Sequence, residues 1–278
     1  MKTLLMARFT FREALHKRVL HGVVALTLAF LILYGLGVWL AFREVPRVSA
    51  YGTDTLGRMM ALQFTLLGLN AVSGIGALMA IFLSVGTISS EVDAGTLHAI
   101  VPKPLTRRDV LWGKWLGFAA MLSIYVLVLA LLVSGTVAFF SGFWSTRIVV
   151  AALPLILQSL LLLSLSIFGT TFMPTVANGV VVFGLYSVAM MAGFVEQLGS
   201  IIRNDAMINV GVVTSLLIPS DAMAKLSAAI LQQGASYLER AGPFMVNSEP
   251  SIWMVVYTLV YGAALLVGAE RIFSRRDL

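Results

Sequence analysis

The sequence predicts an all-α membrane protein with six transmembrane helices, an N-terminal amphipathic helix and a short cytoplasmic helix between the second and third spans. Three observations lead to this prediction. Of the 278 residues, 59% are hydrophobic and only 12% are charged, whereas a soluble domain carries roughly 25% charged residues. Long uncharged runs alternate with charged segments along the chain, and successive loops differ in their content of Lys and Arg.

Each predicted span is an uncharged run of about 20 residues or more, the length that a helix needs to cross the hydrocarbon core. The longest run, 148–195, has 48 uncharged residues and is long enough for two spans. Pro174 and Gly179 interrupt it, because proline and glycine break helices. All Asp, Glu, Lys and Arg residues fall in the segments between these runs or at the chain ends. The predicted spans are about 21–42, 65–88, 115–139, 149–170, 177–195 and 251–270.

The segment 196–250 is predicted to be external or re-entrant. Its apolar stretch, 206–219, has only 14 residues, and segments of that length are more often interfacial or re-entrant than spanning. With six spans, 12 of the 19 Lys and Arg residues fall on the face that carries both termini and 7 on the other. Because cytoplasmic loops are enriched in Lys and Arg, both termini are predicted to be cytoplasmic. A seventh span would place the basic C-terminus outside.

The N-terminal segment 1–20 is predicted to form a basic amphipathic helix on the membrane surface. Leu4, Phe11, Leu15 and Val19 recur at near-helical spacing, which favours one apolar face. Basic residues lie between and after them: Arg8, Arg12, Lys17 and Arg18. A helix of this kind suits the lipid headgroup region. The alternative is a positively charged leader that only directs membrane insertion.

The loop 89–114 carries the most informative pattern in the chain. Glu91, Gly95 and His98 are spaced i, i+4 and i+7, so they share one face of a short helix. Pro102 and Pro104 end that helix, because proline lacks an amide donor and restricts the residue before it. Downstream, Thr-x-x-Asp precedes an apolar run and is typical of a helix start. A short, rigid helix with a glycine-notched polar face is suited to docking.

This loop resembles the coupling-helix region of ABC-2-type (type V) permeases, the six-span membrane subunits of ABC exporters. The resemblance lies in Glu-x-x-x-Gly-Thr-Leu, then Lys-Pro-Leu-Thr-Arg-Arg, then Gly-Lys at the start of the third span. The six-span layout and the N-terminal helix, which would be the family's elbow helix, extend it over most of the chain. The residues expected to dock on an ATPase, or to flank the docking helix, are Glu91, Gly95, Thr96, Leu97, His98, Pro104, Arg107, Arg108, Gly113 and Lys114.

The resemblance implies a single permease domain, 1–278, in a prokaryotic cytoplasmic membrane. It also implies two copies of a separate ATPase subunit, a second permease copy in a homodimer, and lipid as a partner, but no nucleic acid. No Gly-x-x-x-x-Gly-Lys-Ser/Thr loop is present to cradle ATP phosphates. ATP and Mg²⁺ are therefore expected on the partner, with no cofactor on this chain.

Neither catalytic residues nor a metal site is predicted. The chain has no cysteine, its three histidines lack metal-ligand spacing, and its external acids are dispersed, which favours solvated loop residues: Glu44, Asp54, Glu196, Asp205, Asp221, Glu239 and Glu249. The alternatives are an ion-coupled secondary transporter or channel, a membrane enzyme, and a non-transporting assembly protein. No carboxylate, lysine or arginine is predicted inside the membrane. This argues against ion coupling, because ion-coupled transporters bury ionisable groups there.

Polar and flexible side chains in the second and fifth spans allow two interpretations. Ordinary helix packing is one, since small residues bring helices together and methionine fills irregular gaps. The other, which the family resemblance implies, is a translocation path near a dimer axis. The candidate residues are Gln63, Asn70, Ser73, Asn178, Ser187, Met190 and Met191. Nothing in the sequence separates a drug, peptide, lipid, glycan or ion as the substrate.

Overall fold

The structure is a computed structural model that describes residues 2–16, 18–48, 53–85, 107–236, 244, 246 and 250–275. Over these ranges it is entirely helical and contains no strand. The helices are α1 (Lys2–His16), α2 (Arg18–Val48), α3 (Thr53–Ser84), α5 (Arg107–Ser141), α6 (Ile148–Thr170), α7 (Thr175–Ile202), α8 (Asp205–Leu217), α9 (Ser220–Gln232) and α11 (Ile252–Arg275).

Six of these helices are long and apolar enough to cross a membrane, which confirms the predicted all-α fold with six spans. The candidate spans are Leu20–Arg43, Leu56–Ser84, Arg108–Ser141, Ile148–Thr170, Thr175–Ile202 and Ile252–Ser274. Several extend beyond the uncharged runs. The reason is that helical hydrogen bonding continues through charged residues, whereas hydropathy marks only the part of a helix that tolerates hydrocarbon.

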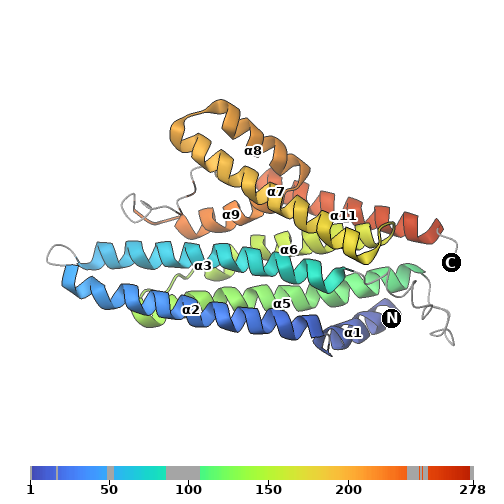
Figure 1. Ribbon diagram of the computed structural model, residues 1–278, viewed down its shortest axis with the longest axis horizontal. Helices are drawn as coiled ribbons and strands as arrows, with labels where there is room; N and C mark the ends of the chain where they lie inside the picture. The colour runs from blue at the N-terminus through green and yellow to red at the C-terminus, as the bar shows by residue number, and fades with distance from the viewer. Residues whose placement is uncertain are drawn as a thin grey trace.

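The spans differ in how much protein covers them. α2, α3, α5 and α6 run along the length of the molecule, and both chain ends lie at the same end of it (Figure 1). The spans in α3 and α6 are 67% and 61% buried, whereas those in α2 and α11 are each 22% buried. Large apolar side chains such as Phe139 and Val176 are more than three-quarters exposed, at 82% and 78%. Exposed apolar surface of this extent fits contact with lipid.

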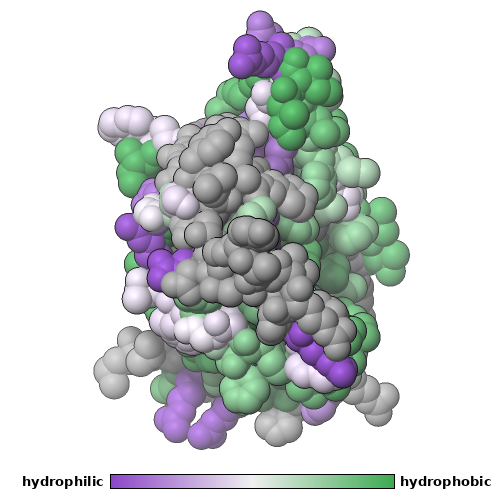
Figure 2. All heavy atoms as spheres, turned by 90° about the vertical axis from the view of Figure 1, so that its left-hand side faces the viewer, coloured by the Kyte–Doolittle hydropathy of each residue, from purple (hydrophilic) through white to green (hydrophobic). Residues whose placement is uncertain are grey.

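Figure 2 shows the molecule from the end opposite the termini. Hydrophilic side chains are distributed around this end, and hydrophobic side chains cover much of the flank beside them. Three of the five tryptophans, Trp39, Trp144 and Trp253, are exposed and lie near the end of the first span, in the turn after α5 and at the start of α11. Tryptophan is enriched where a membrane meets water. Their positions near the ends of spans therefore agree with a membrane-embedded bundle.

The pair α8 and α9 forms a bent hairpin with an angle of 109° between its helices. α7 runs back from the α6–α7 turn, so the hairpin starts at the end of the bundle where α6 begins (Figure 1). α9 returns to that end, because Arg147 Nη1, just before α6, donates a hydrogen bond to Gln233 Oε1 at 3.1 Å. Both ends of the hairpin therefore lie at that end of the bundle, and the two chain ends lie at the opposite end (Figure 1).

Specific contacts hold this hairpin in place. Asn204 caps the start of α8, where its Oδ1 accepts hydrogen bonds from the amides of Ala206 and Met207 at 3.0 and 3.3 Å. The hydroxyl of Tyr257 in α11 donates to the carbonyl of Leu216 near the bend. Ser227 in α9, which is 1% exposed, donates to the carbonyl of Ala151 in α6. α9 is thus fixed along α6.

Candidate functional site: a central cavity, a charged triad and the base of α5

The predicted docking helix lies outside the part of the chain that the structure describes. This applies to Glu91, Gly95, Thr96, Leu97, His98 and Pro104. The description resumes at Arg107, the first residue of α5, whose side chain is also outside it. The structure therefore bears on the flank of the predicted docking element and not on the element itself.

At the base of α5, Glu270 of α11 joins two side chains of α5. Arg108 Nε lies 2.7 Å from Glu270 Oε1, and Trp112 Nε1 donates a hydrogen bond to Glu270 Oε2 at 3.0 Å. The Arg108 side chain is 74% exposed and that of Glu270 is 19% exposed. An exposed ion pair contributes only about 0–1 kcal/mol, but a second, charge-assisted hydrogen bond fixes the geometry of the carboxylate. The last span is thereby linked to the residues that follow the docking loop.

The other side of the α5 base packs against α1. Gly113 and Gly117 lie one turn apart, and a Cβ atom on Gly113 would lie 2.6 Å from Met6 Cβ. A Cβ atom on Gly117 would lie 2.7 Å from the Ala7 carbonyl oxygen. Thr3 Oγ1 also donates to Asp109 Oδ1 at 2.9 Å. Small residues at this spacing allow close helix approach, so α1 is held directly against the first turns of α5.

Two of the expected docking residues are therefore covered by protein. Gly113 faces α1, and Lys114 is only 3% exposed. α1 itself keeps Arg8 and Arg12 exposed, together with Leu5 and Phe9 at 72% and 62%. Lys17 and the side chain of Arg18 are outside the described residues.

The apolar stripe expected on α1 agrees only in part with the face that the fold buries, and the side chains of Leu4 and Val19 lie outside the described residues. Phe11 packs against the core, whereas Leu15 is 45% exposed. Thr10 and Ala14, outside the expected stripe, are 1% and 0% exposed. The protein-facing side of α1 therefore combines small residues with larger apolar ones, while Leu15 stays exposed together with Leu5 and Phe9.

The predicted path residues separate into two groups, and four of them lie apart from the central cavity. Gln63 Oε1 accepts from the amide of Phe244 at 3.4 Å. Asn178, fully buried, donates from Nδ2 to the Ser166 carbonyl at 3.0 Å and packs α7 on α6. Ser187 donates to its own helix at Phe183, and Met191 is 62% exposed. Packing is therefore the role that the contacts of Asn178 indicate.

The other three path residues, Asn70, Ser73 and Met190, line a cavity of about 350 Å³ between α3, α6, α7 and α9. On its lining, Ser73 Oγ and the Gln158 amide exchange two hydrogen bonds, at 3.0 and 2.9 Å. Gln158 is 1% exposed. A mostly apolar cavity with a few converging polar groups is the usual form of a ligand site. Sequence analysis had not singled out Gln158, which nothing in its local sequence distinguishes.

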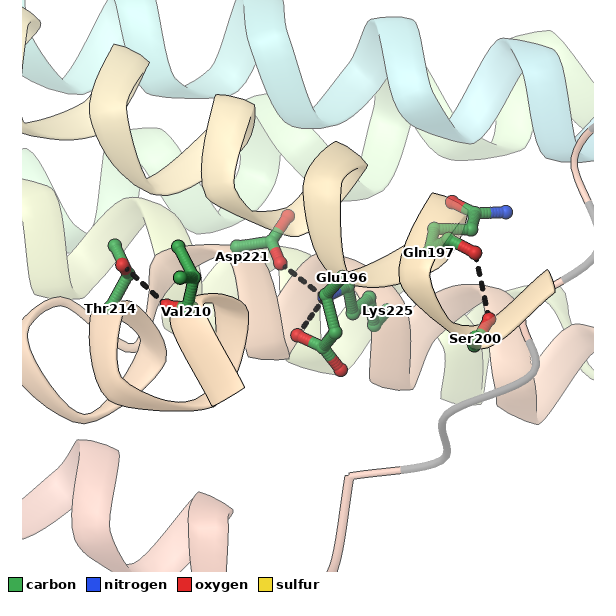
Figure 3. A network of polar contacts seen from close by, with 7 residues as sticks. All are labelled: Glu196, Gln197, Ser200, Val210, Thr214, Asp221 and Lys225. Atoms are coloured by element: carbon green, nitrogen blue, oxygen red, sulfur yellow. Dashed lines mark hydrogen bonds and ion pairs between the residues drawn. The ribbon is translucent and has the colours of Figure 1, made fainter. Parts of the chain in front are cut away.

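A buried charged triad, shown in Figure 3, lies beside this cavity and contributes Asp221 and Lys225 to its lining. Lys225 Nζ in α9 donates to Glu196 Oε2 in α7 at 2.6 Å and lies 2.8 Å from Asp221 Oδ2, one turn earlier in α9. The side chains of Glu196, Asp221 and Lys225 are only 6%, 13% and 11% exposed. Lys225 thus bridges the fifth span to the hairpin.

Two glycines make room for the triad. A Cβ atom on Gly193 would lie 2.2 Å from both carboxylate oxygens of Asp221, and one on Gly211 would lie 2.3 Å from Glu196 Cβ. Each acid therefore packs against the bare backbone of a neighbouring helix. Lys225 and Glu196 also line a second cavity of about 330 Å³, next to Trp253 and Tyr257. The triad separates the two cavities.

The sequence-based interpretation of Glu196 and Asp221 as dispersed, solvated loop acids is wrong. Helix α7 continues past the predicted span end and carries Glu196 within it, and the hairpin brings Asp221 back to it. The Asp221–Lys225 spacing of four residues was a usable local signal. Buried ionisable groups are therefore present, and ion coupling is no longer disfavoured by their absence.

Comparison with protein families matches residues 5–278 to the family described as ABC-2 family transporter protein. The match covers nearly the whole chain. The chain belongs to the ABC-2 transporter family. As an ABC-2 protein it is an integral, multi-pass membrane protein and a membrane permease of an ABC transporter, a class that works with an ATPase partner. The resemblance seen in the loop is thus confirmed at the level of the family. No curated protein matches the chain.

The described part of this ABC-2 protein holds no group of three or more His, Asp or Glu side chains that could bind a metal ion. Some of its buried polar and charged groups, Gln158 and the triad among them, lie at the cavities, while α1 and α11 brace α5 at the end of the bundle that carries the termini. The molecule therefore has two separated elements, one suited to a ligand and one suited to transmitting motion.

Proposed function

We propose that this ABC-2 permease exports a substrate across a prokaryotic cytoplasmic membrane when a separate ATPase subunit hydrolyses ATP. The family match supports the transport role. The sequence has no Walker-type phosphate loop, so ATP and Mg²⁺ are assigned to the partner. We infer two ATPase copies and two permease copies, since closed two-fold dimers are the commonest oligomers.

The coupling element in this proposal is the short helix of the loop 89–114, with Glu91 and Gly95 on its docking face. Its motion passes into α5, whose first turns are held between α1 and α11. Gly113 supports this role by packing on Met6, and Arg108 does so by pairing with Glu270. Gly113 and Lys114 act in this scheme through packing beneath the docking surface. The excess of Lys and Arg at the end that carries the termini supports a cytoplasmic location for that end.

The transport path in this proposal passes through the central cavity. The single observation that carries the assignment is that Asn70 and Ser73 of the second span and Met190 of the fifth line one cavity. A site shared by several helices can change shape when those helices move relative to one another. α1 lies on the membrane surface as the elbow helix, with Arg8 and Arg12 towards lipid headgroups.

The coupling assignment is tested with Gly95→Trp in the chain purified from its native membrane. A bulky side chain at the docking face should remove the co-purifying ATPase and ATP-dependent transport in inverted vesicles, while insertion stays normal. Gly22→Trp is the matched control, because Gly22 has no atom within 4 Å of its Cβ position. Retention of both the ATPase and transport by Gly95→Trp would refute the coupling assignment.

A second candidate function is favoured by one observation, the buried triad. Ion-coupled transporters use intramembrane acids to bind protons or cations, and Glu196 and Asp221 are such acids. The two functions differ in energy source. Transport in inverted vesicles that persists without ATP and collapses when ionophores dissipate the ion gradients would establish ion coupling instead.

A further inference from the structure

We propose that the central cavity binds a ligand that carries one positive charge on an apolar body, with the charge placed beside Asp221. The inference names a substrate class for the proposed function. It rests on that function only for the ligand being transported, and the binding itself follows from the site.

The cavity reaches the middle of the bundle. Asn70 lies near the middle of the span Leu56–Ser84, and Gln158 near the middle of Ile148–Thr170. Asp221 lies at the start of α9, next to the bend of the hairpin, and lines the same cavity. α9 then runs outward, since Ser227 contacts Ala151 and Gln233 contacts Arg147. The hairpin therefore carries a carboxylate to mid-depth.

The triad has an excess of one negative charge when all its members are ionised. Two carboxylates share one ammonium, and both lie within hydrogen-bond distance of Lys225 Nζ. Among the described residues, Lys225 is the only Lys or Arg that lines the cavity. An excess charge in a site with little water is unfavourable unless a counter-charge accompanies it. A cationic ligand supplies that counter-charge.

Glu196 and Asp221 differ in which cavity they line. Asp221 lines the central cavity, whereas Glu196 faces the second cavity on the far side of Lys225. A ligand in the central cavity therefore meets Asp221 first. An anion would be opposed there, because the ammonium of Lys225 already serves two carboxylates.

The remaining lining suits an organic cation better than a bare metal ion. Leu67, Met190 and Phe194 provide apolar surface, and Tyr186 adds a second aromatic ring. Aromatic faces attract ammonium groups, and apolar walls favour the body that carries them. The volume of about 350 Å³ admits a small aromatic or branched ammonium compound.

The test uses three probes that share one shape and differ in charge. They are 3-hydroxyphenyltrimethylammonium, its neutral carbon isostere 3-tert-butylphenol, and the anion 3-hydroxybenzenesulfonate. Binding is measured by displacement of the tritiated ammonium compound from the purified full-length permease in nanodiscs, without ATPase. We expect the neutral isostere to bind at least about tenfold more weakly than the cation, and the sulfonate not to compete.

Variants identify the charge responsible. Asp221→Asn and Glu196→Gln each leave a neutral pair with Lys225, so each should remove the preference for the cation. Asp205→Asn is the control, because this exposed acid of α8 lies outside both cavities and its loss should leave the preference intact. If Asp221→Asn does not fold, Glu196→Gln carries the comparison.

Three outcomes would overturn the inference: equal binding of cation and isostere to the wild-type chain, tight binding of the sulfonate, or an unchanged preference in the Asp221 and Glu196 variants. Equal binding would mean that a proton alone neutralises the triad. ATP-dependent export without cation selectivity would remove this inference and leave the proposed function standing. Cation binding without ATP-dependent export would support this inference and contradict the proposed function.

Discussion

The ammonium nitrogen of Lys225 lies 2.6 Å from Glu196 Oε2, and this contact joins the bent hairpin of α8 and α9 to the fifth span. The two residues are 29 positions apart in the chain. Both side chains are nearly inaccessible to water, so the pair can be maintained only while α7 and α9 keep their relative position. If the hairpin moves during transport, either the Lys225–Glu196 contact breaks or α7 moves together with α9.

Replacing Lys225 should destabilise the protein strongly. Lys225→Gln leaves two buried carboxylates without their shared cation, and breaking a buried pair typically costs about 3–5 kcal/mol. We expect a clear fall in the thermal unfolding midpoint of the purified chain. The triple variant Glu196→Gln, Asp221→Asn, Lys225→Gln should recover most of the loss, because no unpaired charge remains. An unfolding midpoint for Lys225→Gln equal to wild type would show that the triad is solvated.

Enlarging Gly117 should detach α1 from α5. The added side chain of Gly117→Leu would collide with the carbonyl oxygen of Ala7. This oxygen belongs to the main chain of α1, so it cannot shift without moving the helix. The cysteine-free chain permits a direct readout: Thr3→Cys with Asp109→Cys should form a disulfide on oxidation, since the native side chains are 2.9 Å apart. Gly117→Leu should reduce that cross-link, and Gly37→Leu, with open space at its Cβ, should not. Undiminished cross-linking would contradict the packing.

The contacts of Glu270 should differ in strength. A double-mutant cycle on Arg108 and Glu270 should give a coupling of about 0.2–1 kcal/mol, because Arg108 is largely exposed. Glu270→Ala should cost more than Glu270→Gln, since the glutamine can still accept the hydrogen bond from Trp112. Unfolding in denaturant measures both effects. Equal losses in the two Glu270 variants would mean that the Trp112 contact adds nothing.

The topology predicts which positions face which side. Single cysteines at Asn204 and Gln233, at the two ends of the hairpin, should react with an impermeant thiol reagent in intact cells. A cysteine at Leu278 should react only after the cells are opened, because six spans return the C-terminus to the starting side. Labelling of position 278 from outside would exclude the six-span arrangement. If position 204 were labelled and position 233 were protected, the hairpin would cross the membrane as a span.

The sequence by itself determined the membrane fold, the number of spans and the family resemblance. Hydropathy decides the membrane fold and the number of spans, because a bilayer accepts only helices whose side chains tolerate hydrocarbon over about 20 residues. The family resemblance came from the residue pattern of the loop 89–114. The turn at Pro174 between the fourth and fifth spans is also local, since proline cannot continue a helix. The structure shows the turn there, with Pro174 just before α7.

The tertiary structure alone decided which polar residues meet. Asn70 and Ser73 line a cavity, Asn178 packs α7 on α6, and Gly113 faces α1. Glu196 and Asp221, taken as solvated from their flanking sequence, instead share Lys225 inside the protein. The physical reason is that hydropathy is summed along one helix, whereas a buried charge becomes tolerable only through partners on other helices. The contact between Glu196 and Lys225 depends on how α7, α8 and α9 pack, which no local pattern encodes.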